Sequence, residues 1–583
     1  MKKVILHSII FSMALLSIPL LSILGTMLAV SSGNNSSLLL LFIIIPILIA
    51  LATFLKRLIP AENFPWLVLA IASALLFHIS LISSYLVGYD VHLELNFLDS
   101  VIMHSRWVIS IPHEYNAMLS ITILPTIYSH FLNMDGTWIF KIVYPLIYSL
   151  VPVALFQTYR RQTTPLIALL SAFLFMSYSS FYLEMQGLAR QMIAELFLAL
   201  LLILIVDREM NPQKRRLLSL IFSVGLVISH YAVACIFMFF LVPVWLISLR
   251  KKDGESLNET INTTYVNSFI VMLLSWYTFV ASSKPIDSII EVINRIPTDI
   301  LGGLGGGVVY LSPSAVSFIH EISAYVFYII QIFIVLGVIK VLLRYRESKF
   351  DRHYFLMSLM SLGVLVTCVF FPYLAQILQI SRIYHLMLIF LAPYSILGGE
   401  TVFRFAARIL HAGAGIRRNG KPVLLPVCII LIIFLLFQSG FLYEVFRDPQ
   451  PISMPLSGYR VDPLSGWGLY GPYTREQEVL SARWLSQNMG NEWKTYADLG
   501  SMFNVLTSYI PTQYVGKRWE YVLENNTKTI PEGAYIYLRY INLQGKMQSR
   551  EVVSFWDIQD ISNLIDGCNS IYSNGESIIY RRN

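Results

Sequence analysis

Long apolar runs recur along the first 440 residues of this chain and constrain its fold more than any other feature. Most of them are roughly 17–25 residues long, the length of helix that crosses a bilayer core of about 30 Å. Charged residues make up only 13% of the sequence, whereas ordinary soluble domains carry about 25%. We therefore expect an all-α polytopic membrane domain over 1–440 with about 13 spans, near 4–30, 38–55, 65–87, 137–157, 165–182, 192–206, 217–229, 232–249, 266–283, 321–343, 354–372, 383–400 and 423–440.

Positive charge is divided unevenly between the two sets of loops that this layout creates. With the N-terminus inside, the cytoplasmic loops hold 22 lysines and arginines, and the outer loops up to residue 440 hold 6, namely Arg106, Lys141, Arg190, Lys284, Arg295 and Arg382. Cytoplasmic loops of membrane proteins carry such an excess, so the N-terminus is predicted to be cytoplasmic. An odd number of spans in a plasma membrane then puts the C-terminus outside. The net charge of +7 follows from the same loops, and no nucleic-acid partner is expected.

The composition changes after residue 440, where prolines punctuate a linker. We expect 441–583 to be a small extracytoplasmic soluble domain of α/β or α+β type, with a helix at 474–489 and strands at 534–540 and 577–580. Thr474 and Gln477 fit a capping box for that helix. The sequence has four cysteines and no Cys-x-x-Cys pair, so neither a zinc site nor a disulfide framework is predicted. The domain shows no nucleophile motif, and we expect it to bind partners or position an acceptor.

Two of the predicted outer loops are long. The first, 88–136, contains apolar stretches at 95–111 and 119–131, which we expect to lie as helices along the membrane interface. The second, 284–320, contains a glycine-rich stretch at 302–307 without the Gly-Lys-Ser/Thr of a phosphate-binding loop. This second loop is either a flexible linker or a mobile loop over a site.

Asp90, His92 and Glu94 follow the third predicted span at its outer end. In an extended segment all three side chains would point the same way, whereas in a helix only Asp90 and Glu94 would share a face. Either arrangement brings two carboxylates together at the membrane surface, where they can hold a divalent cation or supply a general base. The alternative is that they are solvated loop residues that merely end a span.

Further ionisable residues lie at other outer turns, in apolar surroundings. Glu184 and Arg190 belong to one turn, His230 to another, and Arg382 begins a late span. Ionisable groups at such depth usually face a cavity or a partner, and the planar fork of an arginine suits a phosphate. Structural alternatives remain open: a Glu184–Arg190 pair, a satisfied interfacial histidine, and an arginine that snorkels to lipid headgroups. Carboxylates and arginines on one side of a membrane suit a substrate that is both lipid-borne and phosphorylated.

The layout and these short motifs resemble the GT-C superfamily of glycosyltransferases over about residues 65–440. The resemblance is carried by Asp90 in the first long outer loop, by the turn 183–191, by Ser229-His230-Tyr231 and by Arg382-Ile383-Tyr384. In one respect the chain departs from the superfamily, whose acidic loop usually follows the first span rather than the third; two extra N-terminal spans would explain this. The segments 484–486 and 535–540 are similar to uncharacterised archaeal multi-pass membrane proteins, which suggests an archaeal cell envelope.

The resemblance implies a membrane glycosyltransferase that uses a polyprenyl-phosphate-type donor and a glycan, lipid or protein acceptor of the envelope. It assigns catalysis to Asp90 and Glu94, the donor phosphate to Arg382, Arg190 and His230, and supporting roles to His92 and Glu184. No cofactor is required, and an Mg²⁺ or Mn²⁺ ion at Asp90 and Glu94 is optional. Two other functions stay open: a transporter or flippase of lipid-linked sugars, and a non-catalytic envelope scaffold. Transporters tend to carry repeats and polar groups near the midplane, so the outer position of these residues favours an enzyme.

Overall fold

The computed structural model of the chain describes residues 2–55, 58–111, 113–249, 260–281, 317–371, 379–410, 423–448, 456, 474–489, 493–549 and 554–583. The predicted glycine-rich stretch 302–307 lies outside the described residues.

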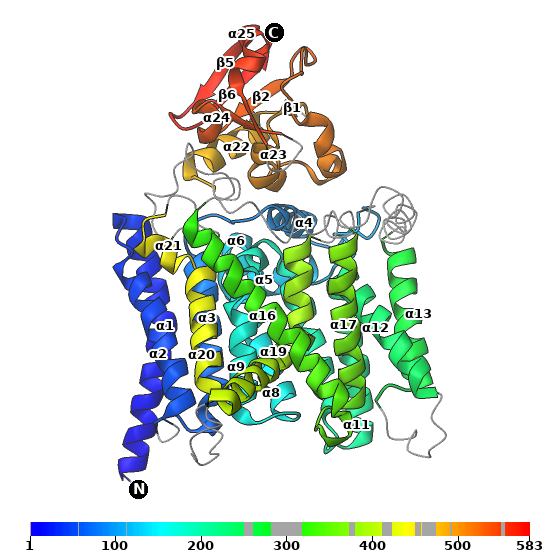
Figure 1. Cartoon of the computed structure of the whole chain (residues 1–583). Coiled ribbons are helices and arrows are strands. Elements are labelled where there is room, and N and C mark those ends of the chain that lie inside the picture. The colour runs from blue at the N-terminus through cyan, green and yellow to red at the C-terminus, as the bar shows by residue number, and fades with distance from the viewer. Residues whose placement is uncertain are drawn as a thin grey trace.

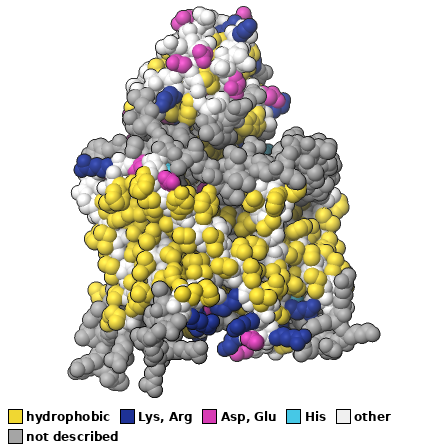
Figure 2. Space-filling view, in the orientation of Figure 1, with side chains coloured by type: hydrophobic (Ala, Val, Ile, Leu, Met, Phe, Trp, Pro, Cys, Tyr) yellow, Lys and Arg dark blue, Asp and Glu magenta, His cyan; other side chains and the backbone are white. Residues whose placement is uncertain are grey.

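Long apolar helices pack side by side into a bundle that makes up most of the molecule (Figure 1). In chain order these are α1 (Lys2–Ser32), α2 (Ser36–Phe54), α3 (Phe64–Ser80), the continuous run α6 to α8 (Gly136–Arg160), α9 (Pro165–Ser177), α10 (Ala189–Val206), α11 (Pro212–Ser229), α12 (Tyr231–Leu249), α13 (Thr263–Phe279), α16 (Phe318–Leu343), α17 (Arg352–Phe370), α19 (Ile380–Leu410) and α20 (Leu424–Gln438). Hydrophobic side chains form a broad band across the visible face of the bundle, and most of the visible charged side chains lie above or below that band (Figure 2). Such a surface is stable in lipid, so the chain is a multi-pass membrane protein.

By length and hydropathy, nine of the described helices can cross a membrane, or ten when the bent pair Pro165–Ser177 and Ser179–Gly187 is taken as one span. The predicted total of about 13 is higher, although every predicted span falls on a helix. The predicted spans 217–229, 266–283 and 423–440 fall on α11, α13 and α20. α11 begins with the basic run Lys214, Arg215 and Arg216, while α13 has 17 residues and α20 has 15.

The N-terminus and the C-terminal part of the chain lie at opposite ends of the bundle (Figure 1). Between the bundle and the C-terminal part lies α4 (Asp90–His104), which is followed by α5 (Ile123–Leu132). α4 and α5 overlap the stretches 95–111 and 119–131 that were predicted to be helical, with different bounds. The first predicted stretch begins too late, because it is defined by apolar residues and leaves out the polar residues 90–94, whereas Asp90 is the first residue of the helix.

A buried lysine fixes the chain just before α4. Lys141 lies in a π-helical segment, Ile139–Val143, inside the span Gly136–Arg160. Its ammonium group donates hydrogen bonds to the carbonyls of Ser80, Ser83 and Tyr85. Carbonyls at a helix C-terminus lack intrahelical partners. Lys141 therefore supplies a donor to the carbonyl at the end of α3 and holds in place the segment that leads to Asp90.

The C-terminal part is a small mixed α/β unit. It contains α22 (Glu476–Asn488), α23 (Leu499–Asn504), the 3₁₀ segments η8 (Leu506–Ser508) and η9 (Thr512–Tyr521), and a sheet of order β1-β2-β6-β5. In that sheet β1 (Thr495–Tyr496) is parallel to β2 (Tyr535–Leu538), while β2 and β5 (Cys568–Ser573) are both antiparallel to β6 (Ile578–Arg582). The remaining strands, β3 (Lys546–Gln548) and β4 (Phe555–Asp557), form a separate antiparallel pair.

The predicted α/β character of this region is confirmed, and its predicted helix and strands appear as α22, β2 and β6. The predicted capping box is wrong in detail. The backbone N–H of Arg475 donates to the Glu478 side chain at 3.1 Å, whereas the Thr474 hydroxyl donates to the Asn504 carbonyl. The helix starts later than predicted, so the glutamate and not Gln477 occupies the third helical position.

Candidate active site

A close approach between two glycines brings the start of α4 against the turn before α10. Gly88 has φ +120°, in the region that favours glycine, and a Cβ atom there would lie 2.6 Å from the Cα of Gly187. Only a residue without a side chain fits this contact. It sets Asp90, two residues after Gly88, beside Arg190 in the first turn of α10.

Asp90 is held through one of its two carboxylate oxygens. Asp90 Oδ2 accepts a hydrogen bond from Arg190 Nη2 at 2.8 Å and from Arg382 Nη1 at 3.4 Å. The side chain is 30% exposed, so its other oxygen is open to a ligand. Burial alone would raise the pKa of Asp90, but the positive charges of Arg190, Arg382 and Arg518 outweigh it and lower that pKa.

Glu94 lies one helical turn after Asp90 and is fully buried. Its carboxylate accepts hydrogen bonds from Arg190 Nη1 at 2.5 Å and from the backbone N–H of Ala189 at 2.8 Å. It therefore caps the N-terminus of α10, where backbone N–H groups lack partners. Burial raises the pKa of Glu94 to about 7, and the charge of Asp90 adds to this effect while Arg190 opposes it. Asp90 and Glu94 are called the carboxylate pair below.

Arg190 links the two members of the carboxylate pair. Separate nitrogens of its guanidinium bind Asp90 and Glu94, and the group lies over the ring of Tyr115 with 4.4 Å to the ring centroid. The Arg190 side chain is only 7% exposed. The structural alternative of a Glu184–Arg190 pair is not what the structure contains, since the partners of Arg190 come from α4.

Arg382 is more open than Arg190. It lies in the first turn of α19, and its side chain is 25% exposed. Besides the contact with Asp90, its Nε atom lies 3.9 Å from Glu184 Oε2, too far for a hydrogen bond. The Nε atom of Arg382 is buried and makes no hydrogen bond within the described part of the chain. The guanidinium thus keeps donors for a ligand.

His230 lies between α11 and α12, close enough to the same charges to be influenced by them. Its Nδ1 accepts a hydrogen bond from the Val233 backbone at 3.3 Å, and its ring stacks on that of Tyr231. Burial, and after it the charge of Arg190, lowers the pKa of His230 well below its usual value. A neutral imidazole that accepts at Nδ1 carries its proton on Nε2, where it can donate.

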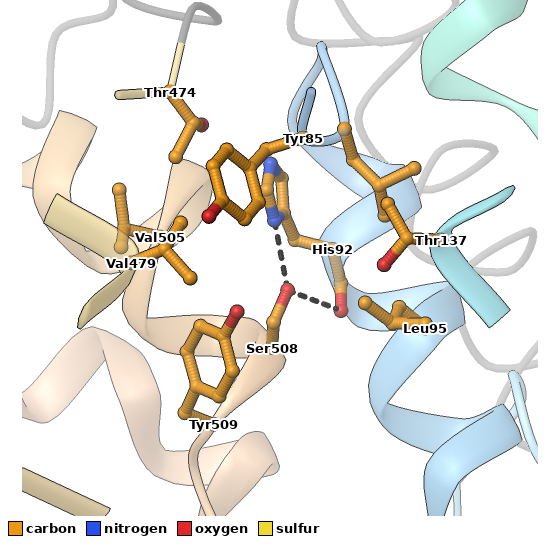
Figure 3. Close-up of a pocket in the computed structure, with 10 residues that line it drawn as sticks. Tyr85, His92, Leu95, Thr137, Thr474, Val479, Val505, Ser508 and Tyr509 are labelled. Carbon is orange, nitrogen blue, oxygen red and sulfur yellow. Dashed lines mark hydrogen bonds between the residues drawn. The ribbon is translucent and has the colours of Figure 1, made fainter. Parts of the chain in front are cut away.

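His92 lies apart from this group. The helical form of the segment means that Asp90 and Glu94 share a face, and His92 points elsewhere. His92 Nδ1 is hydrogen-bonded to the hydroxyl of Ser508 at 2.8 Å, at the contact between α4 and the C-terminal part (Figure 3). Burial, with a smaller contribution from Arg539, lowers the pKa of His92 to about 3.

A second polar cluster lies deeper in the bundle and was missed by the sequence reasoning. The Tyr148 hydroxyl donates to Glu195 Oε2 at 2.7 Å and lies 2.9 Å from His385 Nε2, while Gln191 donates to Glu195 Oε1. Glu195 and His385 are fully buried. The cluster joins α10 and α19 on the bundle side of Arg190 and Arg382. Two sequence signals point to it: a glutamate, Glu195, inside the predicted span 192–206, and a histidine three residues after Arg382.

The carboxylate pair does not fit the optional metal site. Among the residues that the structure describes, no group of three or more His, Cys, Asp or Glu side chains is arranged to hold a metal ion. Arg190 already occupies an oxygen of Asp90 and one of Glu94. A divalent cation needs several oxygen ligands and would have to displace this guanidinium.

The fold and the site together define a multi-pass membrane protein with an arginine–carboxylate site at the end of its bundle that carries the C-terminal part. Residues 214–580 match the family model described as "Predicted membrane protein (DUF2206)", and the chain belongs to this family. No curated protein matches the sequence.

Solved structures similar to the chain include two of the Archaeoglobus fulgidus oligosaccharyltransferase and one of ArnT from Cupriavidus metallidurans. The oligosaccharyltransferase in its apo form is 11% identical with a TM-score of 0.46, over 90% of this chain and 75% of that chain. The same protein tethered to an acceptor peptide is 10% identical with a TM-score of 0.46, over 85% and 74% of the two chains. ArnT in the apo state is 11% identical with a TM-score of 0.44, over 89% and 98%.

Proposed function

We propose that this protein is a membrane glycosyltransferase of the GT-C type, which transfers a sugar from a polyprenyl-phosphate-type donor to an acceptor hydroxyl. The observation that carries the proposal is the state of Asp90. Its Oδ2 is fixed by Arg190 and Arg382, and no described residue donates a hydrogen bond to its Oδ1. A carboxylate that is oriented through one oxygen and open through the other can receive a proton from an acceptor.

The site also offers cations to a phosphate. Arg382 has free donors and a partly exposed guanidinium, while Arg190 is committed to the carboxylate pair. Arg382 is therefore the main phosphate ligand in this proposal. Arg190 orients Asp90 and adds positive charge, and the neutral His230 donates from Nε2. The short motifs that resemble GT-C glycosyltransferases contain these same residues.

The transfer proceeds as one displacement. The acceptor oxygen bonds to the anomeric carbon of the sugar, the bond from that carbon to the phosphate oxygen breaks, and the lipid phosphate leaves with the electron pair. Asp90 takes the proton of the acceptor hydroxyl. When the donor phosphate binds Arg382, it offsets part of the charge that lowers the pKa of Asp90. Donor binding thus makes Asp90 a stronger base at the moment it is needed.

The charge bias of the loops supports an outward-facing site. Helix α4, which carries the carboxylate pair, lies at the end of the bundle next to the C-terminal part, opposite the N-terminus (Figure 1). If the lysine- and arginine-rich loops are cytoplasmic, this end faces outward in a plasma membrane. Donor, acceptor and C-terminal part then meet on the outer face.

Release of labelled sugar tests the proposal. The purified protein is mixed in detergent with polyprenyl-phosphate glucose or mannose, first with water as a substitute acceptor and then with envelope extracts. General-base catalysis contributes about 10²–10⁴-fold, so Asp90→Asn should lower sugar release by that factor. Asp99→Asn, an aspartate on the same helix outside the site, is the matched control and should retain wild-type turnover.

Two outcomes would count against the proposal. One is wild-type turnover by the Asp90→Asn variant. The other is transport of the intact lipid-linked sugar across a vesicle membrane without cleavage of the sugar–phosphate bond, which would favour a flippase.

A further inference from the structure

Helix α4 is shared between the bundle and the C-terminal part. The face opposite the carboxylate pair carries His92 and Asn96, which are one turn apart. His92 binds Ser508, as described above, and the Asn96 amide donates to the carbonyls of Thr507 at 3.0 Å and Ile510 at 2.6 Å. All of these residues are buried or nearly so. The C-terminal part is thus fixed in position relative to the site, and Figure 3 shows the small cavity that this contact leaves.

This contact places an arginine of the C-terminal part at the site. The segment η9, which contacts α4, begins two residues after Ile510 and carries Arg518. The Arg518 guanidinium lies over the ring of Phe503, with 4.7 Å to the centroid, and donates to the Val515 carbonyl at 3.3 Å. Its charge acts on Asp90 and on Tyr115, the residue over which Arg190 lies.

The charges of three arginines therefore act on Asp90, and these arginines differ in what they already bind. Arg190 is held by both members of the carboxylate pair. Arg382 has long contacts to Asp90 and Glu184. Arg518 has no carboxylate within ion-pair distance among the described residues, and its buried Nε atom makes no hydrogen bond there. A partly buried guanidinium without a carboxylate partner is costly unless a ligand supplies the negative charge.

We propose that Arg518 and Arg382 form a clamp for the phosphate of the lipid-linked donor, with one arginine supplied by each part of the chain. This inference rests on the proposed function and extends it, because the site is then complete only when the C-terminal part is docked on α4. Arginine suits the role, since its planar fork binds phosphate oxygens in pairs. The ring of Phe503 under Arg518 keeps that fork oriented.

Binding of undecaprenyl monophosphate, measured by its effect on the melting temperature of the purified protein, tests the clamp directly. Arg518→Gln should raise the apparent Kd about tenfold or more, which is what the loss of a charged hydrogen bond contributes. Arg518→Lys keeps the positive charge but lacks the planar fork, so its apparent Kd should lie between those of wild type and Arg518→Gln. Lys517→Gln removes the neighbouring, exposed positive charge and should bind within about twofold of wild type.

Parallel ligands identify the source of the phosphate. Undecaprenol, which lacks the phosphate, should bind all variants equally. Inorganic phosphate should show the same dependence on Arg518 at lower affinity, because it lacks the lipid chain. Equal binding of undecaprenyl monophosphate by Arg518→Gln and Lys517→Gln would overturn the clamp. So would an equal loss of undecaprenol binding, because the substitution would then disturb the fold and not the phosphate.

The sugar-release assay separates this inference from the proposed function. If binding depends on Arg518 but no variant or wild type releases sugar, the phosphate clamp stands and the enzyme proposal fails. If wild type and Arg518→Gln release sugar at equal rates and with equal KM for the donor, the enzyme proposal stands and the clamp fails.

Discussion

Replacing Glu94 with alanine should destabilise the protein more than replacing any other carboxylate of the site. Glu94 is fully buried, and its carboxylate accepts from the Ala189 backbone N–H at 2.8 Å and from Arg190 Nη1 at 2.5 Å. The alanine variant leaves both donors buried without this acceptor. Arg190 then keeps only its bond to Asp90.

The expected loss follows from these two donors. Each buried donor left without a partner costs about 1–3 kcal/mol, so the variant should lose roughly 3 kcal/mol or more in total. At roughly 2–4 °C per kcal/mol for a large domain, the apparent melting temperature should fall by roughly 6–12 °C. Asp90→Ala should cost less, about 1–3 kcal/mol, because it leaves one buried donor of Arg190 without its acceptor and its own side chain is 30% exposed.

The melting temperature can be followed with a thiol-reactive fluorophore, since Cys368 and Cys428 are buried in the folded protein. Glu184→Ala is the matched control: Glu184 belongs to the same site, but its nearest cation lies 3.9 Å away and its side chain is 29% exposed. Glu94→Gln, which keeps an oxygen acceptor, should melt between wild type and Glu94→Ala. Equal melting temperatures for Glu94→Ala and Glu184→Ala would refute the assignment of Glu94 as the residue that anchors Arg190 and α10.

Two further predictions concern residues outside the proposed catalytic group. Burial, and after it the charge of Asp135, raises the pKa of Asp99 from 3.8 to about 7. Between these two pH values the folded protein binds a proton that the unfolded chain has released. The free energy of unfolding therefore falls as the pH rises through this range. Asp99→Asn should therefore melt above wild type at pH ~8, with the difference shrinking below pH ~7, and a difference independent of pH would contradict the burial of this carboxyl. Tyr148→Phe should lower the melting temperature by several degrees, because the buried Glu195 loses a donor worth about 1–3 kcal/mol. Tyr325 makes an exposed hydrogen bond to Glu321, so Tyr325→Phe should leave the melting temperature unchanged. Equal effects of the two substitutions would contradict the buried hydrogen bond between Tyr148 and Glu195.

Hydropathy carried most of the fold prediction, because a lipid-facing helix must be apolar over its whole length. The predicted spans that do not meet the length and hydropathy criteria for a membrane-crossing helix are informative. α11 starts with three basic residues that a membrane span would not normally contain, yet it is helical because it packs against other helices of the bundle. In the C-terminal part, β2 and β6 were foreseen from their β-branched and aromatic residues, and they pair with each other in the sheet.

Part of the site could be predicted, because polar residues at the ends of apolar runs stand out. The sequence left open whether 90–94 is extended or helical, and the helix resolves this by placing Asp90 and Glu94 together and His92 on another face. It also left open a structural pair between Arg190 and Glu184, whereas the structure pairs Arg190 with residues 96 and 100 positions away.

The contributions of the C-terminal part had no sequence signal. His92 and Ser508 are 416 positions apart, and nothing in a single sequence shows that two such residues meet. Arg518 looks like an ordinary basic residue beside Lys517. Its role depends on the docking of η9 on α4, which only the three-dimensional structure reveals.

Steady-state kinetics of the Asp90→Asn variant with a polyprenyl-phosphate sugar shows whether Asp90 is the general base. Asp90 touches the acceptor and not the donor phosphate in this account, so kcat should fall by about 10²–10⁴-fold while the affinity for undecaprenyl monophosphate stays near that of wild type. A variant that keeps the wild-type kcat, or that loses donor affinity and turnover in equal proportion, would contradict the assignment of Asp90 as the base.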